Sequence, residues 1–317
     1  MRIELLGAQA ELLGDPHLGR QFINGVPLHR RNDREASVLA DFKASLAKAG
    51  EVDLHVCMGD LFDKWYVPYT TIATAALAYL EAARSAPGCT FIILAGNHDV
   101  SRDMEKKGGF DLFAMIVASV PNIVIVRDKP HYEVLDDGTA GFFPYHLTET
   151  AASLITQPLD AAFGHWDTIF GDGNMIPTKE LADMGCATAY TGHVHLPERF
   201  KRHNVDVVVV GSLQPYAHGE DHGEMYVTLT SDALEGRDLA DKCVRIQLKP
   251  GEVFDQTVDC LQLTFKRPET TATEEVEVSM GDFNMAALFA QAFDEEDVPE
   301  KIRTALLTKF EEARVKE

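Results

Sequence analysis

The chain has 317 residues, of which 45% are hydrophobic and 25% are charged, a balance that excludes a disordered chain and allows a large globular domain with small additions. No run approaches roughly 18 consecutive apolar residues, and the N-terminus lacks a signal-peptide pattern, so we expect a soluble, cytoplasmic protein without membrane contact. The formal net charge of −21 argues against a polyanionic partner unless the charges are segregated along the chain.

Short apolar runs alternate with helix-like patterns over the first 230 residues. Residues 1–7 allow either an extra short strand or a ragged start, and strands follow at 53–58, 90–95, 123–126, 141–144, 207–210 and 225–230. Helices are predicted at 36–50, 70–86 and 110–119. This alternation indicates an α/β sheet with parallel pairs of strands. Two more strand-like runs, 243–248 and 258–265, suggest a small added lobe at residues 231–266.

Five of the apolar runs end at a glycine or tight turn that is followed by His, Asp or Asn. In chain order they supply Asp15 and His17, Asp60, Asn97 and His98, His165, and His193 and His195. Residues i and i+2 of an extended chain point to one side, so the first and last pairs can each face a common centre. Any one of these residues alone is better explained as a turn cap or core residue. Five such motifs in order make coincidence improbable and indicate a shared site.

Carboxylate, amide and imidazole groups are the mixed oxygen and nitrogen ligands that suit two divalent transition ions. Asp60 ends the central strand and can bridge such ions at roughly 3.5–4 Å, the separation found in two-metal hydrolases. Asp63 and Asp99, beside the main motifs, are candidates for orienting the ligands, with turn capping as the alternative. The pattern therefore predicts a two-metal hydrolytic centre.

This ordered set of motifs, over about residues 9–230, resembles the calcineurin-like metallophosphoesterase superfamily. Three stretches narrow the resemblance to the SbcD-type nucleases, the nuclease subunits of double-strand-break repair and recombination complexes, including short phage forms. They are Asp15-x-His17-Leu18-Gly19-Arg20 followed by Arg31 and Asp33, Gly59-Asp60-Leu61-Phe62-Asp63, and Gly211-Ser212-Leu213-Gln214 running to Glu220. The resemblance implies a four-layer α-β-β-α sandwich at residues 1–230 and a metal-dependent phosphodiesterase.

The resemblance also implies a role for each candidate ligand. One ion would be held by Asp15, His17 and His195, and the other by Asn97, His165 and His193. Asp60 would bridge the two ions, which are expected to be Mn²⁺, and His98 would be the catalytic histidine beside the leaving group. A histidine in that place can protonate a departing sugar oxygen.

The candidate DNA contacts are basic side chains after the first ligand pair and one histidine near the end of the last motif. They are Arg20, Arg30, Arg31, Arg34 and His218. Residues 1–50 hold seven Lys and Arg against six Asp and Glu, a net of +1, whereas residues 269–317 hold five against thirteen, a net of −8. Because acidity is densest far from the ligand motifs, the overall charge does not exclude DNA. A solvated helix start explains the arginine cluster equally well.

The C-terminal segment differs in composition from the rest of the chain. Residues 267–280 are polar and poor in apolar side chains, which is typical of a linker. Residues 281–317 predict two helices: 283–293 is apolar nearly all round, and the second, after Pro299, carries an apolar stripe at Ile302, Leu306, Phe310 and Ala313. Packing back on the catalytic core would explain both helices. The resemblance implies instead a helix-loop-helix that docks on an SbcC-like ATPase, in a complex that contains a homodimer of the nuclease.

Three classes of function remain open from the sequence. The first is a DNA nuclease subunit of an SbcCD-type complex, and the second is a stand-alone metallophosphoesterase such as a protein phosphatase or nucleotide phosphodiesterase. The third, a non-catalytic scaffold, is disfavoured because every ligand position holds a residue able to bind metal. The C-terminal helices favour the first class over the second, since a free-standing phosphatase has no evident need of them.

Overall fold

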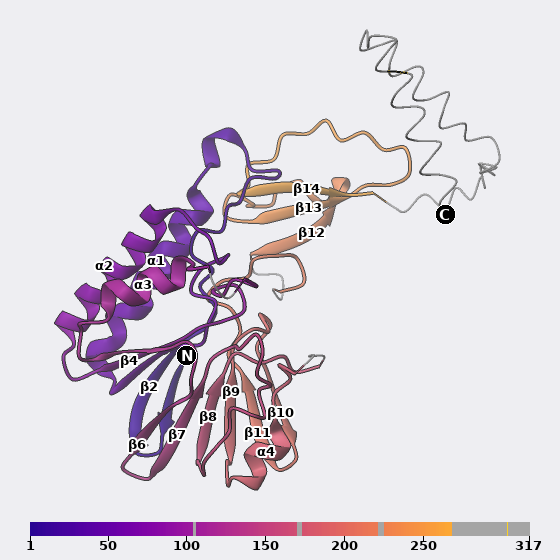
Figure 1. The fold of residues 1–317 in the computed structure, drawn as a ribbon. Helices are drawn as coiled ribbons and strands as arrows, with labels where there is room; N and C mark the ends of the chain where they lie inside the picture. Colours follow the sequence, from indigo (N-terminus) through magenta and orange to yellow (C-terminus); the bar gives the residue numbers. More distant parts are fainter. Residues whose placement is uncertain (104–105, 170–172, 221–224, 268–302, 304–317) are drawn as a thin grey trace. The chain divides into compact units, whose positions relative to one another are not determined.

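The computed structural model describes residues 1–103, 106–169, 173–220, 225–267 and 303 (Figure 1). The chain divides into two compact units, Met1–Arg267 and Pro268–Glu317. Apart from Arg267 and Arg303, the predicted linker at 267–280 and the predicted helices at 281–317 lie outside the described residues. Every described strand belongs to the first unit.

The first sheet carries five strands in the order β1-β2-β3-β4-β5. Their bounds are β1 Arg2–Leu5, β2 Ala8–Leu13, β3 Leu54–Cys57, β4 Thr90–Leu94 and β5 Ile123–Val126. Strands β2 to β5 are parallel and β1 pairs with β2 in antiparallel fashion, so the first residues form a strand and not a ragged start. The carboxyl ends of β2, β3 and β4 therefore meet at one edge of the sheet.

Three helices lie together on the outer face of this sheet (Figure 1), namely α1 Asp33–Ala47, α2 Tyr69–Ser85 and α3 Gly109–Val117. Short 3-10 turns flank α1 at η1 Leu28–Arg30 and η2 Lys48–Glu51. The helices pack on the sheet through one apolar cluster whose fully buried aromatic members include Phe42, Tyr79, Phe91 and Phe113. Burial of such a side chain stabilises the fold by roughly 1.5–3 kcal/mol, so this cluster fixes the helices against the strands.

The second sheet carries six strands in the order β10-β11-β9-β8-β7-β6. Their bounds are β6 His131–Leu135, β7 Gly138–Phe143, β8 Ala161–Gly164, β9 Thr188–Thr191, β10 Glu198–Arg202 and β11 Val205–Val209. Strands β7, β8, β9 and β11 are parallel, and β6 and β10 are antiparallel edge strands. Sequence reasoning missed both edge strands, because their half-buried or exposed residues form no continuous apolar run.

The two sheets pack face to face through a second apolar cluster, which includes Val56, Ile92, Phe142 and Phe163. A third cluster joins the second sheet to the short helix α4 Thr178–Asp183. The layers therefore run helices, sheet, sheet, helix, which confirms the predicted α-β-β-α sandwich. None of the helices in the described part of the chain combines the length and apolar character that a membrane span requires.

A third, smaller sheet consists of the parallel strands β12 Tyr226–Thr230, β13 Cys243–Gln247 and β14 Gln262–Lys266. It has an apolar cluster of its own, and the turn η3 Ser231–Ala233 follows β12. The prediction that 225–230 is the last strand of the core was wrong, because among the described strands β12 pairs only with β13. An apolar run predicts a strand but does not identify the partner of that strand.

Candidate metal centre

The candidate ligands lie on loops that follow the carboxyl ends of strands in both large sheets. Strands β2, β3 and β4 lead to Asp15, Asp60 and Asn97, while β8 and β9 lead to His165 and His193. Both large sheets therefore bring candidate ligands to one place.

Three overlapping groups of side chains each bring three possible donor atoms within 4.8 Å of one another. The groups are Asp15, His17 and His195; His17, Asp60 and His98; and Asp60, His165 and His193. Asn97 joins the third group, because its Oδ1 lies 2.9 Å from His165 Nε2 and 2.9 Å from His193 Nδ1. The structure thus collects in one place the residues that the sequence assigned to metal binding and to catalysis.

Asp60 occupies the middle of this constellation. Its Oδ2 lies 3.3 Å from His165 Nε2 and 3.8 Å from His17 Nε2, and its Oδ1 accepts a hydrogen bond from the His98 backbone N–H at 2.8 Å. His17 Nε2 in turn lies 3.0 Å from His195 Nε2. One carboxylate oxygen therefore faces a donor from each of the two predicted ligand sets.

The outer ring nitrogens of two candidate ligands have partners of their own. His165 Nδ1 lies 3.0 Å from the Met58 carbonyl oxygen, and His195 Nδ1 lies 3.0 Å from Glu220 Oε2. Partners of this kind fix the tautomer and orientation of a ligating imidazole. Sequence reasoning gave Glu220 no role of its own, although its position at the end of the 211–220 motif was a signal.

Glycines allow the ligand loops to approach closely. A Cβ at Gly96 would lie 2.1 Å from Asp60 Oδ1, and a Cβ at Gly59 would lie 2.3 Å from His165 Nδ1. Non-bonded heavy atoms pack best at about 3.5–4.0 Å, so no side chain fits at either position. Asp60 and His17 themselves adopt left-handed φ angles of 46° and 45°, at a cost of roughly 1–3 kcal/mol each. The surrounding contacts must hold this strained arrangement in place.

A comparison with known families agrees with this geometry, since residues 12–211 match the profile of the calcineurin-like phosphoesterases. The chain belongs to the calcineurin-like phosphoesterase family. No curated protein matches the sequence. Membership makes the chain a metal-dependent phosphoester hydrolase, because calcineurin-like phosphoesterases use divalent metals.

The residues of this phosphoesterase fit divalent cations. Its carboxylate, amide and imidazole donors form the mixed set that suits first-row transition ions. Asp15 Oδ1 is buried and has no hydrogen-bond partner among the described residues. A buried polar atom without a partner costs roughly 1–3 kcal/mol, a cost that a bound cation would offset.

The buried candidate ligands of the phosphoesterase differ in the direction in which their pKa values are shifted. Burial alone would lower the pKa of His165, but the carboxylates of Asp60 and Asp15 outweigh it and raise that pKa to about 10. Burial raises the pKa of Asp15 to about 7, against the attraction of His165. Burial lowers the pKa of His17 to about 3, so its imidazole is neutral at pH 7 and keeps a lone pair for a metal. A cation at this centre would displace protons from His165 and Asp15.

Asp99 and Asp63 support the ligand loops in different ways. Asp99 accepts hydrogen bonds of 2.9 to 3.1 Å from three backbone N–H groups, those of Gly96, Leu61 and Phe62. It therefore caps the turn after β4 and ties the loop after β3 to the loop after β4, while its role in orienting ligands stays a prediction. Asp63 Oδ1 lies 3.9 Å from His17 Nδ1, beyond hydrogen-bond distance, so the orienting role of Asp63 stays a prediction.

Arg34 is a structural residue in this fold. Its side chain is 2% exposed, and its guanidinium donates to Gln214 Oε1 at 2.7 Å and to the Pro215 carbonyl oxygen at 2.8 Å. The guanidinium carbon also lies 4.7 Å from the centre of the Phe22 ring. The DNA contact predicted for Arg34 is therefore not supported, because clustering of charge in a sequence does not reveal which arginine is buried.

The other predicted DNA contacts are at least partly accessible. Arg31 is exposed, and Arg20 is half-buried with its Nη1 3.4 Å from Asp63 Oδ1. The half-buried Arg30 pairs with acidic side chains, and the ring of His218 packs edge-on against Tyr226. Arg31 is the candidate most open to solvent.

Proposed function

We propose that the chain is a two-metal-dependent DNA nuclease that hydrolyses phosphodiester bonds as the nuclease subunit of an SbcCD-type repair and recombination complex. The observation that carries the chemistry is the position of Asp60 Oδ2, which lies 3.8 Å from His17 Nε2 and 3.3 Å from His165 Nε2. A carboxylate oxygen with one ligand set on either side is what a bridging ligand requires.

The proposed ligand sets follow the groups in the structure. Asp15, His17 and His195 would hold one ion, Asn97, His165 and His193 would hold the other, and Asp60 would be shared. We assign Mn²⁺, which accepts such mixed oxygen and nitrogen donors. When bound, two divalent ions lower the pKa of water, orient the phosphodiester and offset the charge on its oxygens. The chain's own contribution is to hold the donors in fixed positions.

His98 is proposed to protonate the leaving sugar oxygen. Its Nδ1 lies 2.5 Å from the Asp63 carbonyl oxygen, so Nδ1 carries a hydrogen, and the proton given to the leaving oxygen would come from Nε2 of the imidazolium form, which returns to neutral imidazole. Its ring centre lies 4.9 Å from that of His17, beside the first ligand set. Because His98 also forms a group of possible ligands with His17 and Asp60, its test must include the metal content.

Two observations support DNA as the substrate. The motifs at 15–20, 59–63 and 211–220 resemble those of SbcD-type nucleases, and basic side chains follow the first ligand pair. Arg31 is exposed and Arg20 is partly exposed, as contacts to a phosphate backbone require.

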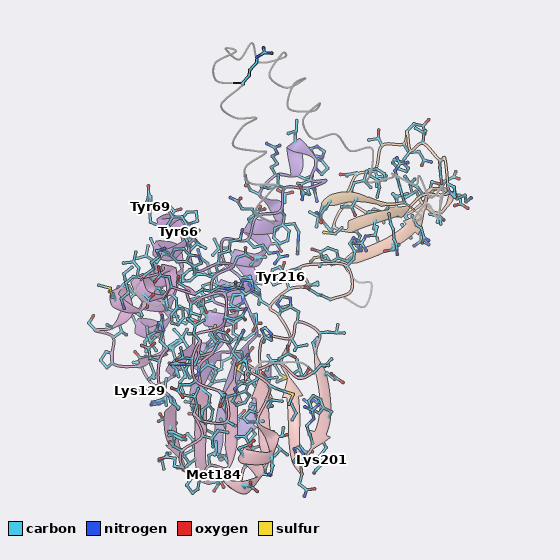
Figure 2. All side chains as sticks on the ribbon, turned by 45° about the vertical axis from the view of Figure 1, so that its right-hand side comes forward. Tyr66, Tyr69, Lys129, Met184, Lys201 and Tyr216 are labelled. Atoms are coloured by element: carbon cyan, nitrogen blue, oxygen red, sulfur yellow. The ribbon has the colours of Figure 1, made fainter. Side chains whose placement is uncertain are left out.

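The proposed homodimer is supported by large apolar side chains that are exposed on neighbouring helices. Tyr69 and Leu77 of α2 are 79% and 65% exposed, and Met115 of α3 is 72% exposed. Figure 2 shows Tyr69, with Tyr66, pointing outward at the start of α2. Exposed apolar side chains that form one patch mark interaction sites in soluble proteins, and a double variant tests whether these side chains form such a site. Leu77→Glu with Met115→Glu should give a monomer in light scattering, and an unchanged mass would exclude this surface.

The helices predicted at 281–317 are proposed to dock on an SbcC-like ATPase. Truncation after Thr270 keeps the whole compact unit Met1–Arg267, so the shortened chain should bind metal and cleave short substrates. It should no longer co-purify with the SbcC-like protein encoded in the same genome. Retained binding of that protein, or a large fall in Tm on truncation, would contradict the docking role.

The function is tested by assays on four DNA and phosphodiester substrates with and without Mn²⁺. The substrates are duplex, single-stranded and hairpin DNA and a generic phosphodiester, each given to the wild type, to Asp60→Asn and to Asp206→Asn. Asp206 is exposed on β11, so its variant is a matched control for the loss of one carboxylate. We expect Mn²⁺-dependent DNA cleavage that Asp60→Asn abolishes and Asp206→Asn retains. Hydrolysis of the generic phosphodiester alone, with all three DNA substrates left intact, would indicate a stand-alone phosphodiesterase.

A further inference from the structure

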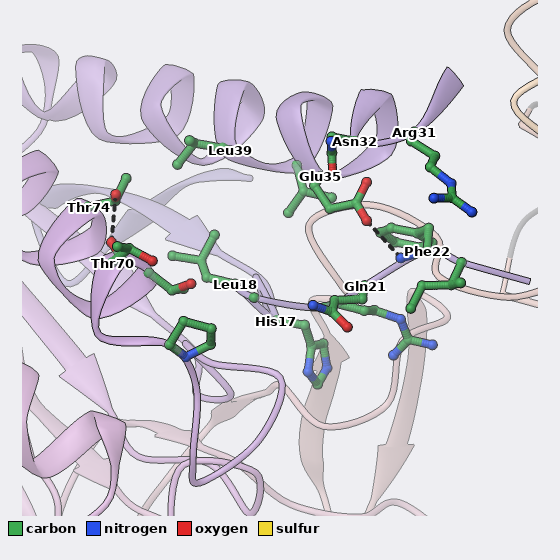
Figure 3. A pocket seen from close by; sticks show the side chains of 16 residues that line it. His17, Leu18, Gln21, Phe22, Arg31, Asn32, Glu35, Leu39, Thr70 and Thr74 are labelled. Atoms are coloured by element: carbon green, nitrogen blue, oxygen red, sulfur yellow. Dashed lines mark hydrogen bonds between the residues drawn. The ribbon is translucent and has the colours of Figure 1, made fainter. Parts of the chain in front are cut away.

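A cavity of about 510 Å³ opens beside the candidate metal centre (Figure 3). Its walls come from three stretches of the chain, namely residues 17–23, the first half of α1 and the start of α2. His17 is both a proposed metal ligand and part of this wall. A group held in the cavity and a phosphate at the centre can therefore belong to one molecule.

The cavity combines an apolar base with a few polar groups. Leu18, Val38 and Phe22 line it and are 4%, 4% and 8% exposed. Thr70 and Thr74 form the wall on the α2 side, where the Thr74 hydroxyl donates to the Thr70 carbonyl oxygen (Figure 3). Binding sites of roughly 300–1,000 Å³ with this composition hold small organic groups, with the few polar atoms fixing the orientation.

Glu35 supplies the polar group that distinguishes this cavity. Its Oε1 accepts the Phe22 backbone N–H at 2.8 Å, whereas its Oε2 is buried and has no hydrogen-bond partner among the described residues. A buried carboxylate oxygen that accepts no hydrogen bond costs folding free energy. A ligand with an N–H group could donate to Oε2 and offset this cost. Arg20 and Arg31 also line the cavity, so the negative charge of Glu35 bears only on the position beside its Oε2 and excludes no phosphate elsewhere in the cavity.

We propose that the cavity binds the base of the nucleotide next to the scissile phosphate, with Glu35 accepting a hydrogen bond from an amino group of that base. This inference rests on the proposed phosphodiesterase function and adds a preference among nucleotides to it. A base is flat, largely apolar on its faces and carries N–H donors at its edge, as the wall requires. The chain would then prefer diesters that carry an amino-bearing base at this position.

The test compares two diesters that release the same p-nitrophenolate. One is methyl p-nitrophenyl phosphate, and the other is the p-nitrophenyl ester of 2′-deoxyadenosine 5′-monophosphate, both with the full chain and Mn²⁺. Thr74→Trp fills the cavity, and Ala73→Trp places the same side chain at an exposed neighbouring position outside it. Thr74→Trp should lower the ratio of kcat/KM for the nucleotide ester over the methyl ester about tenfold, and Ala73→Trp should not.

A second variant tests the hydrogen bond itself. Glu35→Gln keeps an acceptor for Phe22 but can place an amide NH₂ where Oε2 stands. The wild type should prefer the deoxyadenosine ester to the ester of its analogue without the 6-amino group by about tenfold, and Glu35→Gln should lose this preference. An equal effect of Thr74→Trp on both diesters, or an unchanged preference in Glu35→Gln, would overturn the base site. A wild type that hydrolyses neither diester would instead contradict the proposed function, and the base site with it.

Discussion

The metal centre and the cavity beside it are neighbours that are built in opposite ways. At the centre, His165 binds the Met58 carbonyl and faces Asp60, and a Cβ at Gly96 would have no space. The cavity instead is an open space of about 510 Å³. A closely packed site fails when one part moves, whereas the wall of an open cavity can change and keep the chemistry. The centre is therefore expected to control whether hydrolysis occurs, and the cavity which diester is preferred.

The largest effect is expected from a single methyl group at the centre. A Cβ at Gly96 would lie 2.1 Å from Asp60 Oδ1, so Gly96→Ala must displace the proposed bridging ligand. We expect Mn²⁺-dependent hydrolysis to fall to background and metal occupancy to drop. Gly88→Ala is the control, because a Cβ there meets nothing within 4 Å. A Gly96→Ala variant with full activity and two bound ions would show that the centre tolerates movement.

His98→Ala separates binding from chemistry within the centre. If His98 protonates the leaving group, kcat should fall by roughly 10²–10⁴-fold while both ions stay bound. Metal content measured by mass spectrometry of the dialysed protein checks this. Loss of an ion would show that His98 is a ligand, as its proximity to His17 and Asp60 also allows.

Glu220→Gln tests the outer support of the centre with a smaller expected effect. Glu220 Oε2 lies 3.0 Å from His195 Nδ1 and raises the pKa of that imidazole, although burial acts in the opposite direction. Loss of such a partner usually costs about 10–100-fold in metal affinity or activity. Glu198→Gln, at an exposed position of β10, is the control. Equal Mn²⁺ affinity in both variants would show that Glu220 does not support metal binding.

The sequence predicted the centre far better than its surroundings. Asp15, Asp60 and His165 could be found because each follows an apolar strand, and parallel strands bring such residues to one edge whatever the rest of the chain does. Glu220 could not be assigned, since its role depends on how the segment after β11 returns to His195. Local patterns reveal where a strand ends but not which distant loop comes back to it.

The same limit explains the errors in the fold. The strand at 225–230 was predicted correctly, but its membership in the third sheet depends on β13, a pairing that the run itself does not encode. Arg34 looked like part of a basic surface, yet tertiary contacts with Gln214 and Pro215 bury it. The edge strand β10 has charged residues on both sides of Phe200 and therefore gave no apolar signal.

Metal binding by the wild type should depend on pH. The pKa of His165 is raised to about 10, where its carboxylate neighbours outweigh burial, and burial raises the pKa of Asp15 to about 7. Both groups must lose a proton to bind a cation, so Mn²⁺ affinity should increase with pH across the range 6 to 8, by roughly tenfold per pH unit for each proton released. Calorimetry in two buffers of different ionisation enthalpy counts these protons. An affinity independent of pH would mean that the ligands are already deprotonated.

The most direct test of the two-ion centre is the number and coupling of Mn²⁺ ions, measured by equilibrium dialysis together with electron paramagnetic resonance. Asp60 Oδ2 faces both ligand sets, at 3.8 Å from His17 Nε2 and 3.3 Å from His165 Nε2. The wild type should therefore bind two Mn²⁺ per chain with a spin-coupled spectrum, and Asp60→Asn should lose the coupling and at least one ion. A single ion in the wild type, or two ions without coupling, would contradict the bridging role of Asp60.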